Sequence, residues 1–305
     1  MYSESAILMA TYNGEKFISD QIFSIQNQTR TNWRLYIRDD GSTDRTMSII
    51  EKFVNEDPRI KLISDKDGNI GVKRGFMRLL RMTKAEYYFF SDQDDIWLPD
   101  KMDETIKKFE THSSKTPVLV HTNLTTVDEK LGILNRNFHP ISNKIDNLNV
   151  MLASNSVTGC TMAVNHALRE KIYNDPAELM IMHDWWMGLC AVTLGSIEYV
   201  QKPTILYRQH ATNQVGTDTT LREKINRVFS YNTEVRRAKD SFKQAGSFLR
   251  IHGFEITMST KKIISAYAKL LEENSAKRVS ILLKYSFKKQ SFIGTVSLWY
   301  VVIMT

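Results

Sequence analysis

Cysteine is scarce in this chain of 305 residues, which contains only Cys160 and Cys190. Two thiols are too few for a disulfide framework or a zinc ribbon. Low cysteine usage is typical of proteins of the reducing cytosol. The first residues also lack the basic stretch that precedes the apolar core of a secretory signal. We therefore expect a cytoplasmic protein.

Long apolar runs and glycine-rich nucleotide motifs are lacking as well. Residues 291–305 are 15 residues without a charged side chain, short of the ~20 that a membrane-spanning helix needs. The loop 68–71 contains two glycines, but it matches neither a Walker loop nor the Gly-x-Gly-x-x-Gly dinucleotide motif. We therefore expect a globular protein with a buried or interfacial segment at residues 291–305.

Positive charge is concentrated in one part of the chain. The whole sequence has 41 Lys+Arg and 34 Asp+Glu, a net charge of +7, but residues 221–305 alone carry 16 basic and 6 acidic residues. Their net charge is +10, which leaves −3 for residues 1–220. The basic residues alternate with Leu, Ile, Phe and Tyr along expected helices, which favours an anionic membrane surface or a partner helix over a nucleic-acid groove. A dimer contact and a solvated helical face are the alternatives.

Apolar runs alternate with amphipathic segments through the first 110 residues, a pattern typical of α/β proteins. We expect strands at residues 6–10, 33–38, 60–63 and 86–90, and a helix at 72–82. Parallel strands joined by right-handed crossovers bind ligands at their carboxyl ends. Polar clusters at residues 11–13, 39–40 and 92–95 follow three of these strands, so we expect them to converge on one edge of the sheet.

The pattern becomes mixed from about residue 115. Apolar runs at residues 118–120 and 160–164 are followed by a helix that contains residues 183–186, and we expect short strands near Ile197 and Ile205. We place this half on the other side of the same cleft, and we expect residues 221–305 to be helical.

Three aspartates fall within four residues, at positions 92, 94 and 95. Carboxylates this close repel one another unless a cation lies between them, and oxygen ligands suit Mg²⁺ or Mn²⁺. A metal with a diphosphate is the ligand that this cluster predicts. The alternative is a solvated turn that caps the next helix.

Two further clusters offer contacts for a nucleotide. Asp40 follows the second strand, where its carboxylate can accept the imide N–H of uracil or thymine, and Tyr12 offers an aromatic face to the base. The alternative for Asp40 is a helix-capping residue in a turn. Lys73 lies at the start of the third helix, where backbone N–H groups and cations favour phosphate; an ordinary surface lysine is the alternative.

The second half supplies a candidate base. His-Asp-Trp-Trp at residues 183–186 puts a carboxylate at a helix start beside two tryptophans, on which sugars stack. Asp184 can take a proton from an attacking hydroxyl, a contribution typically of 10²–10⁴ in rate. The alternative is a helix N-cap with core tryptophans. His210 can add a nitrogen ligand to a metal or bind phosphate, although a lone histidine is more often structural.

Five motifs in this order together resemble the family 2 glycosyltransferases of GT-A fold. They are Ala-Thr-Tyr-Asn at 10–13, Asp-Asp-Gly-Ser-Thr-Asp at 39–44, Asp-Gln-Asp-Asp at 92–95, His-Asp-Trp-Trp at 183–186 and Tyr-Arg-Gln-His at 207–210. The residues of the third and fourth motifs are most similar to those of bacterial rhamnosyltransferases that build cell-wall or capsular polysaccharide. The resemblance covers about residues 5–215 and implies a Rossmann-like, mostly parallel sheet flanked by helices, with a C-terminal helical extension.

The resemblance implies roles for individual residues. Asp40 would bind the base, and Thr11, Tyr12 and Asn13 would frame the nucleoside. Lys73 is a further candidate for donor binding.

The same resemblance implies a metal site and a base. Asp92 would lie near the ribose, and Asp94 would coordinate Mn²⁺ or Mg²⁺ on the diphosphate, with Asp92 and His210 as further candidate ligands. Asp184 would be the general base of an inverting transfer. His183 stands where many relatives have Glu, so the sequence leaves its role open.

The implied function is transfer of a sugar from a nucleoside-diphosphate donor to a glycan hydroxyl. dTDP-rhamnose is the favoured donor, with a growing, lipid-linked polysaccharide as acceptor at the cytoplasmic face of the membrane. Residues 1–110 would form the nucleotide-sugar half, 111–220 the acceptor half, and 221–305 a basic helical region. A UDP-sugar donor, a non-catalytic sugar-nucleotide sensor and a basic-tailed nucleic-acid-binding protein are the alternatives.

Overall fold

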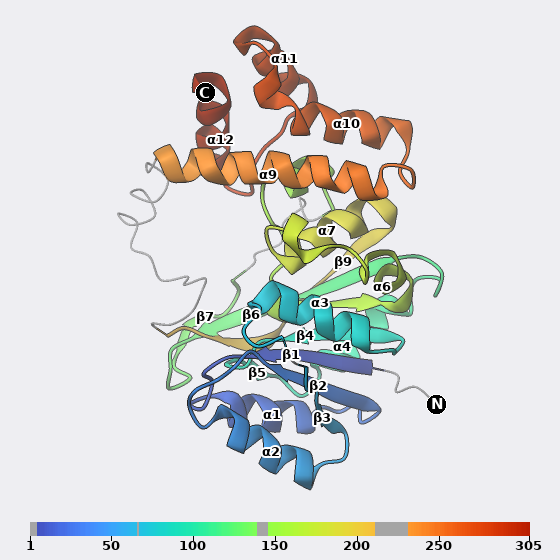
Figure 1. Cartoon of the computed structure of the whole chain (residues 1–305), viewed down its shortest axis with the longest axis vertical. Helices are drawn as coiled ribbons and strands as arrows, with labels where there is room; N and C mark the ends of the chain where they lie inside the picture. The colour runs from blue at the N-terminus through green and yellow to red at the C-terminus, as the bar shows by residue number, and fades with distance from the viewer. Residues whose placement is uncertain (1–4, 66, 139–145, 211–230) are drawn as a thin grey trace.

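The computed structural model describes residues 5–65, 67–138, 146–210 and 231–305 (Figure 1). The first half contains β1 (Ser5–Thr11), α1 (Ile18–Gln26), β2 (Trp33–Asp39), α2 (Thr46–Glu56), β3 (Ile60–Leu62), α3 (Val72–Met82), β4 (Tyr87–Ser91), β5 (Ile96–Trp97) and α4 (Lys101–Phe109). The strands β3, β2, β1 and β4 pair in this order and are all parallel. The predicted strands and the parallel arrangement of the first half are confirmed.

The second half completes the sheet with strands of both directions. It contains β6 (Val118–Val127), β7 (Ile133–Asn135), α5 (Leu148–Ala153), the 3₁₀ turn η1 (Gly159–Thr161), β8 (Met162–Asn165), α6 (His166–Ile172), η2 (Ala177–Leu179), α7 (His183–Leu194) and β9 (Ser196–Arg208). β8 pairs antiparallel with β4 and β6, whereas β6 and β9 are parallel. The sheet therefore continues from β4 through β8, β6 and β9 to β5.

One expectation is wrong in detail, because the two short strands predicted near Ile197 and Ile205 are a single strand, β9. The exposed residues Gln201 and Lys202, followed by Pro203, interrupt the apolar pattern, and proline removes a ladder donor. Pairing with β6 nevertheless continues on both sides of register shifts beside Asn123. The chain therefore forms a bulge at this point, and β9 is not divided by a loop.

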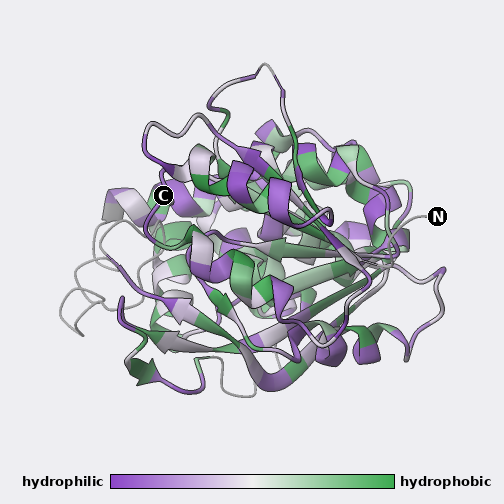
Figure 2. Cartoon of the chain, turned by 90° about the horizontal axis from the view of Figure 1, so that it is seen from below, coloured by the Kyte–Doolittle hydropathy of each residue, from purple (hydrophilic) through white to green (hydrophobic). Residues whose placement is uncertain are grey.

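Successive side chains of a strand point to opposite faces of the sheet, and both faces are covered here. Ile7 and Met9 of β1 pack against α1, α2 and α4, whereas Ala6 and Leu8 belong to the core that is shared with α3 and the later helices. Figure 2 shows the strands largely in the hydrophobic colours, between helices that carry both colours. The covered sheet leaves only its edges for a ligand site.

The C-terminal region is helical, as predicted. It contains α9 (Tyr231–His252), α10 (Met258–Ala268), η3 (Leu270–Glu272), α11 (Ser275–Tyr285) and α12 (Phe292–Met304). Figure 1 shows α9 lying across the molecule, with α7 on one side and α10 to α12 on the other. Buried residues of these helices belong to the same core as α3 and α7. Among the described helices, none is both long and apolar enough to cross a membrane.

Candidate active site

Three loops meet beyond the carboxyl ends of β1, β2 and β4, as predicted. The Tyr12 amide donates to Gln93 Oε1 at 2.9 Å, and Gln93 Nε2 donates back to the Tyr12 carbonyl at 3.0 Å. The Asn13 amide donates to Ser42 Oγ at 2.8 Å. Residues separated by up to 81 positions in the chain therefore share one edge of the sheet.

Asp40 is buried at the centre of this edge. One of its oxygens accepts from Arg38 Nη1 at 2.6 Å and from the Ile70 amide at 2.7 Å, and the other accepts from the Gly71 amide at 2.8 Å. Gly71 has a φ of +79°, which a side chain would strain. Asp40 thus holds the loop before α3 in place, and it retains acceptor capacity on its second oxygen. The predicted contact of Asp40 with a base stays a prediction.

The other predicted nucleoside contacts surround Asp40. Thr11 is buried and donates from Oγ1 to Asp39 Oδ1 at 2.9 Å. The Tyr12 side chain is 49% exposed, so its ring is accessible to a planar ligand. Asn13 has a φ of +48°, and its side-chain oxygen accepts from the Thr43 amide at 2.8 Å.

Lys73 lies farther along the same edge. Its Nζ donates to the Met180 carbonyl at 2.7 Å, which ties the first turn of α3 to the segment before α7. The structure therefore places Lys73 between the two halves of the molecule, and a phosphate contact there stays a prediction.

Asp94 and His210 come together although 116 residues separate them. His210 Nε2 lies 2.8 Å from Asp94 Oδ2, and the imidazole lies against the Phe17 ring with centroids 4.9 Å apart. Arg208 donates to the Asp94 carbonyl from Nε at 3.0 Å and carries its guanidinium over the same Phe17 ring. The end of β9 is thereby fixed against the loop that follows β4.

Asp92 lies beside this pair and has an unusual titration. Burial, then the charge of Asp94, then the charge of Asp184 raise the pKa of Asp92 to about 7. Ligand atoms of Asp92, Asp95 and Cys160 also lie within 4.8 Å of one another. Crowded carboxylates that cannot all ionise alone suit a divalent cation. Asp94 and His210 are not part of that group of three, so metal binding by Asp92, Asp94 and His210 stays a prediction.

Two buried residues lie beneath this loop: Asp95, which belongs to the predicted carboxylate cluster but was given no role of its own, and Lys101, which no sequence motif singles out. Asp95 is fully buried and accepts from the Arg208 amide at 3.2 Å, and burial followed by the charges of Asp94 and Asp92 raises its pKa. Lys101 is buried as well, donates to the Thr161 carbonyl at 3.2 Å, and has its pKa lowered to about 8 by burial. Asp95 was visible in the sequence motif, whereas no pattern around Lys101 signals its burial.

Asp184 lies in the first turn of α7, in the second half of the chain. Asp184 is 9% exposed, and burial raises the pKa of its carboxyl to about 6. Hydrogen bonds from the Trp185 amide, the Asn155 side chain and the Gly159 amide act in the opposite direction and lower this pKa. The charge of Asp184 contributes to the raised pKa of Asp92, so the two carboxyl groups lie close enough for their charges to interact. The predicted base and the predicted metal cluster are therefore neighbours.

His183, whose role the sequence left open, is buried beside Asp184. Its ring packs against Phe76 and Phe90, with centroids 4.4 and 5.6 Å away. Among the described residues neither ring nitrogen has a hydrogen-bond partner, and burial lowers the pKa of His183 to about 3. A neutral aromatic ring therefore stands where a second carboxylate would compete with Asp184 for protons.

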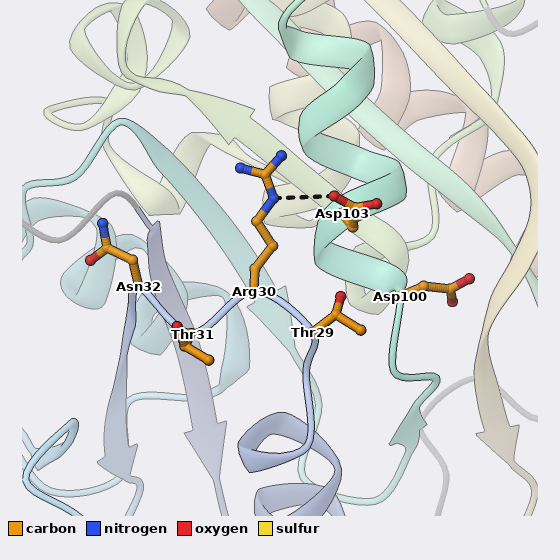
Figure 3. A pocket seen from close by; sticks show the side chains of 6 residues that line it. All are labelled: Thr29, Arg30, Thr31, Asn32, Asp100 and Asp103. Atoms are coloured by element: carbon orange, nitrogen blue, oxygen red, sulfur yellow. Dashed lines mark hydrogen bonds and ion pairs between the residues drawn. The ribbon is translucent and has the colours of Figure 1, made fainter.

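A surface pocket of about 550 Å³ lies elsewhere, where the segment before β2 meets the start of α4. Figure 3 shows its lining, in which Arg30 reaches toward Asp103 with Nε 3.2 Å from Oδ1. This pocket is at the amino end of β2, whereas Asp39 and Asp40 follow the carboxyl end. None of the predicted site residues lines it.

Comparisons with known proteins identify the family of the chain. The model of the family described as Glycosyl transferase family 2 matches residues 6–172. The dTDP-rhamnosyl transferase RfbG of Shigella flexneri is 31% identical over 242 residues, which cover 72% of this chain and 78% of that protein.

Solved structures show the same fold. TarS of S. aureus, in complex with UDP, is 18% identical with a TM-score of 0.58, over 91% of this chain and 75% of that chain. The mannosyltransferase PcManGT of Pyrobaculum calidifontis, in complex with GDP-Man and Mn²⁺, is 16% identical with a TM-score of 0.56, over 94% and 76%. The fold is therefore the expected GT-A fold with a C-terminal helical extension. The chain is a glycosyltransferase and belongs to glycosyl transferase family 2.

Proposed function

We propose that this glycosyltransferase moves a sugar from a nucleoside diphosphate to a glycan hydroxyl with inversion, and that Asp184 is its general base. The observation that carries the proposal is the buried carboxyl of Asp184 in the first turn of α7, which has a pKa raised to about 6 and a charge that acts on Asp92. A base with a pKa just below neutral is ionised at cytoplasmic pH and still accepts a proton readily.

We assign different roles to two groups of residues. Asp184 takes the proton of the acceptor hydroxyl as that oxygen bonds to the anomeric carbon, and the bond to the diphosphate breaks on the opposite face. Asp94, Asp92 and His210 would hold Mn²⁺ or Mg²⁺, which supplies electrostatic stabilisation of the departing diphosphate. His183 contributes no charge of its own, since burial keeps it neutral.

The residues around Asp40 would receive the nucleoside. Thr11, Tyr12 and Asn13 would frame it, and Asp40 would accept the imide N–H of thymine or uracil. Lys73, at the start of α3, would face the phosphates. These roles follow from the shared edge on which the three loops meet.

The favoured donor is dTDP-rhamnose. Support comes from the name of the Shigella flexneri relative, a dTDP-rhamnosyl transferase of 31% identity. The acceptor would be a lipid-linked polysaccharide of the cell wall or capsule, met at the cytoplasmic face of the membrane. We assign donor binding to residues 1–110, acceptor binding to 111–220 and attachment to 221–305.

A UDP-sugar is the second candidate donor. TarS, which shares the fold, binds UDP, and uracil presents the same imide edge as thymine to Asp40. A relative of 31% identity carries more weight for the donor than a fold neighbour of 18% identity, so dTDP-rhamnose stays the first choice.

The test compares Asp184→Asn with the wild type. We expect the variant to bind the donor nucleotide as the wild type does, because the amide keeps the size of the side chain, and to lose transfer by about 10²–10⁴. Calorimetry measures the binding, and release of the nucleoside diphosphate in the presence of acceptor glycans measures the transfer. Turnover close to that of the wild type would remove Asp184 from the role of base.

A further inference from the structure

α12 has an apolar face that the rest of the described molecule leaves exposed. The exposed fractions are 82% for Phe292, 51% for Ile293 and Val296, 54% for Tyr300, 37% for Ile303 and 60% for Met304. At about 100° per residue these six side chains fall within an arc of roughly 120°. Large exposed apolar patches of this kind mark interaction sites.

The opposite face of the same helix is firmly packed. Leu298, Val301 and Val302 are buried in the core shared with α9 and α11, and Trp299 Nε1 donates to the Phe287 carbonyl at 2.8 Å. Ser297 Oγ lies 3.2 Å from Glu234 Oε2 of α9. The orientation of α12 is therefore set by its packing, and its apolar face is presented outward.

Basic residues lie on the segments next to α12 in sequence and in packing. Exposed Lys284 lies in the last turn of α11, Lys288 lies four residues before Phe292, and exposed Arg236 and Arg237 lie on α9, whose Glu234 contacts Ser297 of α12. Glu234 itself is paired with Lys289 at 2.7 Å and with Arg237. An apolar helix face flanked by cations matches the headgroup boundary of an anionic bilayer.

The segment that leads into α12 is connected to the proposed base. Gln290, two residues before α12, donates from Nε2 to the Asn155 carbonyl at 2.6 Å, and the Asn155 side chain is hydrogen-bonded to Asp184. The start of α12 is thus connected to the base through one residue. A bilayer in contact with α12 would lie near the place where the acceptor hydroxyl must arrive.

We propose that α12 is an interfacial anchor, whose exposed face inserts among the headgroups of an anionic bilayer while Lys284, Lys288, Arg236 and Arg237 bind the lipid phosphates. With 13 residues and about 1.5 Å per residue, α12 is about 20 Å long, so it lies in the interface and does not cross the ~30 Å hydrocarbon core. The idea that this bilayer carries the lipid-linked acceptor rests on the function proposed above. The binding of α12 to lipid does not rest on that function.

The test is sedimentation of the full chain with vesicles of phosphatidylcholine alone, or of phosphatidylcholine with phosphatidylglycerol. We expect binding to the anionic vesicles, weaker binding at high salt, and at least about a tenfold lower partition coefficient for Phe292→Ser/Val296→Ser, because two large apolar side chains no longer enter the interface. The matched control, Met82→Ser/Leu134→Ser, changes exposed apolar residues of α3 and β7 and should bind as the wild type does.

Three results would overturn the proposal. They are a wild type that stays in the supernatant, a Phe292→Ser/Val296→Ser variant that sediments like the wild type, and a dimer in gel filtration that this variant dissociates, which would assign the face to a second copy of the chain. No donor or acceptor is present, so a failure here is separate from a failure of the proposed transfer reaction. Calorimetric nucleotide binding by the variant checks that its active site is intact.

Discussion

Asp184 and Asp92 both have raised pKa values in this enzyme, and the charge of Asp184 contributes to the pKa of Asp92. Burial is the main cause for both, but their surroundings differ. Asp184 receives hydrogen bonds from the Asn155 side chain and two backbone amides, whereas Asp92 faces the charges of Asp94 and Asp184. A cation bound at Asp92 and Asp94 removes the repulsion there. The hydrogen bonds and burial at Asp184 remain, so its proposed role as a base does not depend on a second protein carboxylate.

The titration of Asp184 predicts the pH dependence of transfer. A general base must be ionised, so kcat/KM should fall about tenfold per pH unit below a pKa near 6 and become level above it. Initial rates of nucleoside-diphosphate release between pH 5 and pH 8, at saturating metal, measure this profile. The acid limb should be missing from the residual activity of Asp184→Asn; the same limb in that variant would assign the titration to another group.

The residues of the site differ in how far sequence could predict them. Asp92, Asp94 and Asp184 stand in motifs whose chemistry can be inferred from their order, and in the structure the charges of Asp94 and Asp184 act on Asp92. The dual use of Asp40, which holds the loop before α3 through two amides, is not visible in sequence because those amides lie 30 and 31 residues away. Burial of Lys101 depends on the same long-range packing.

At the scale of elements, a charged cluster joins α9 to the catalytic part. Asp175 Oδ2 lies 2.8 Å from His252 Nε2 and accepts from Trp186 Nε1 at 2.8 Å, and His252 Nδ1 lies 3.0 Å from Glu255 Oε1. Two carboxylates that only accept require an imidazolium between them. Because Trp186 lies two residues from Asp184, this cluster anchors the helix that carries the base.

The cluster predicts a pH-dependent stability. Burial disfavours the imidazolium, but hydrogen bonds to Asp175 and Glu255 outweigh it, and the pKa of His252 is raised. The contribution is therefore fully present below the unfolded value of about 6.5 and is lost as pH rises through the folded pKa.

His252→Gln should lower the free energy of unfolding by about 1–3 kcal/mol at pH 6, and by less at pH 9. Denaturant unfolding at both pH values measures this. His166→Gln, at an exposed histidine of α6, is the control and should be nearly neutral. An equal loss at both pH values for His252→Gln would show that packing, and not the charge, is what the variant removes.

The element pattern was predictable where local periodicity decides it. The helix expected at residues 72–82 is α3 with the same bounds, because its apolar side chains recur on one face. β9 was divided into two because Pro203 breaks the local pattern, whereas pairing with β6 carries the strand past it. The antiparallel placement of β8 between β4 and β6 follows from tertiary pairing that no local pattern encodes.

At the scale of the whole molecule, the charge distribution separates residues 221–305 from the rest of the chain, but the packing of the core does not. The net charge of residues 221–305 marked them as a separate basic region in sequence. In the structure their buried side chains complete the same core as α3 and α7, so the region packs directly on the catalytic part. Sequence could predict helices there but not the outward face of α12, which depends on which side of the helix meets α9.

The central claim is that one edge of the sheet binds a nucleoside-diphosphate sugar together with a divalent cation. The most direct measurement is calorimetric titration of the full chain with dTDP-rhamnose in Mn²⁺, in Mg²⁺ and in chelator. Asp94→Ala tests the metal site, and Asp240→Ala, at an exposed carboxylate of α9, is its control. We predict binding in either metal that chelator and Asp94→Ala abolish and Asp240→Ala preserves. Absence of nucleotide binding with dTDP, UDP and GDP in every metal condition, or binding indifferent to chelator and to Asp94→Ala, would contradict the account.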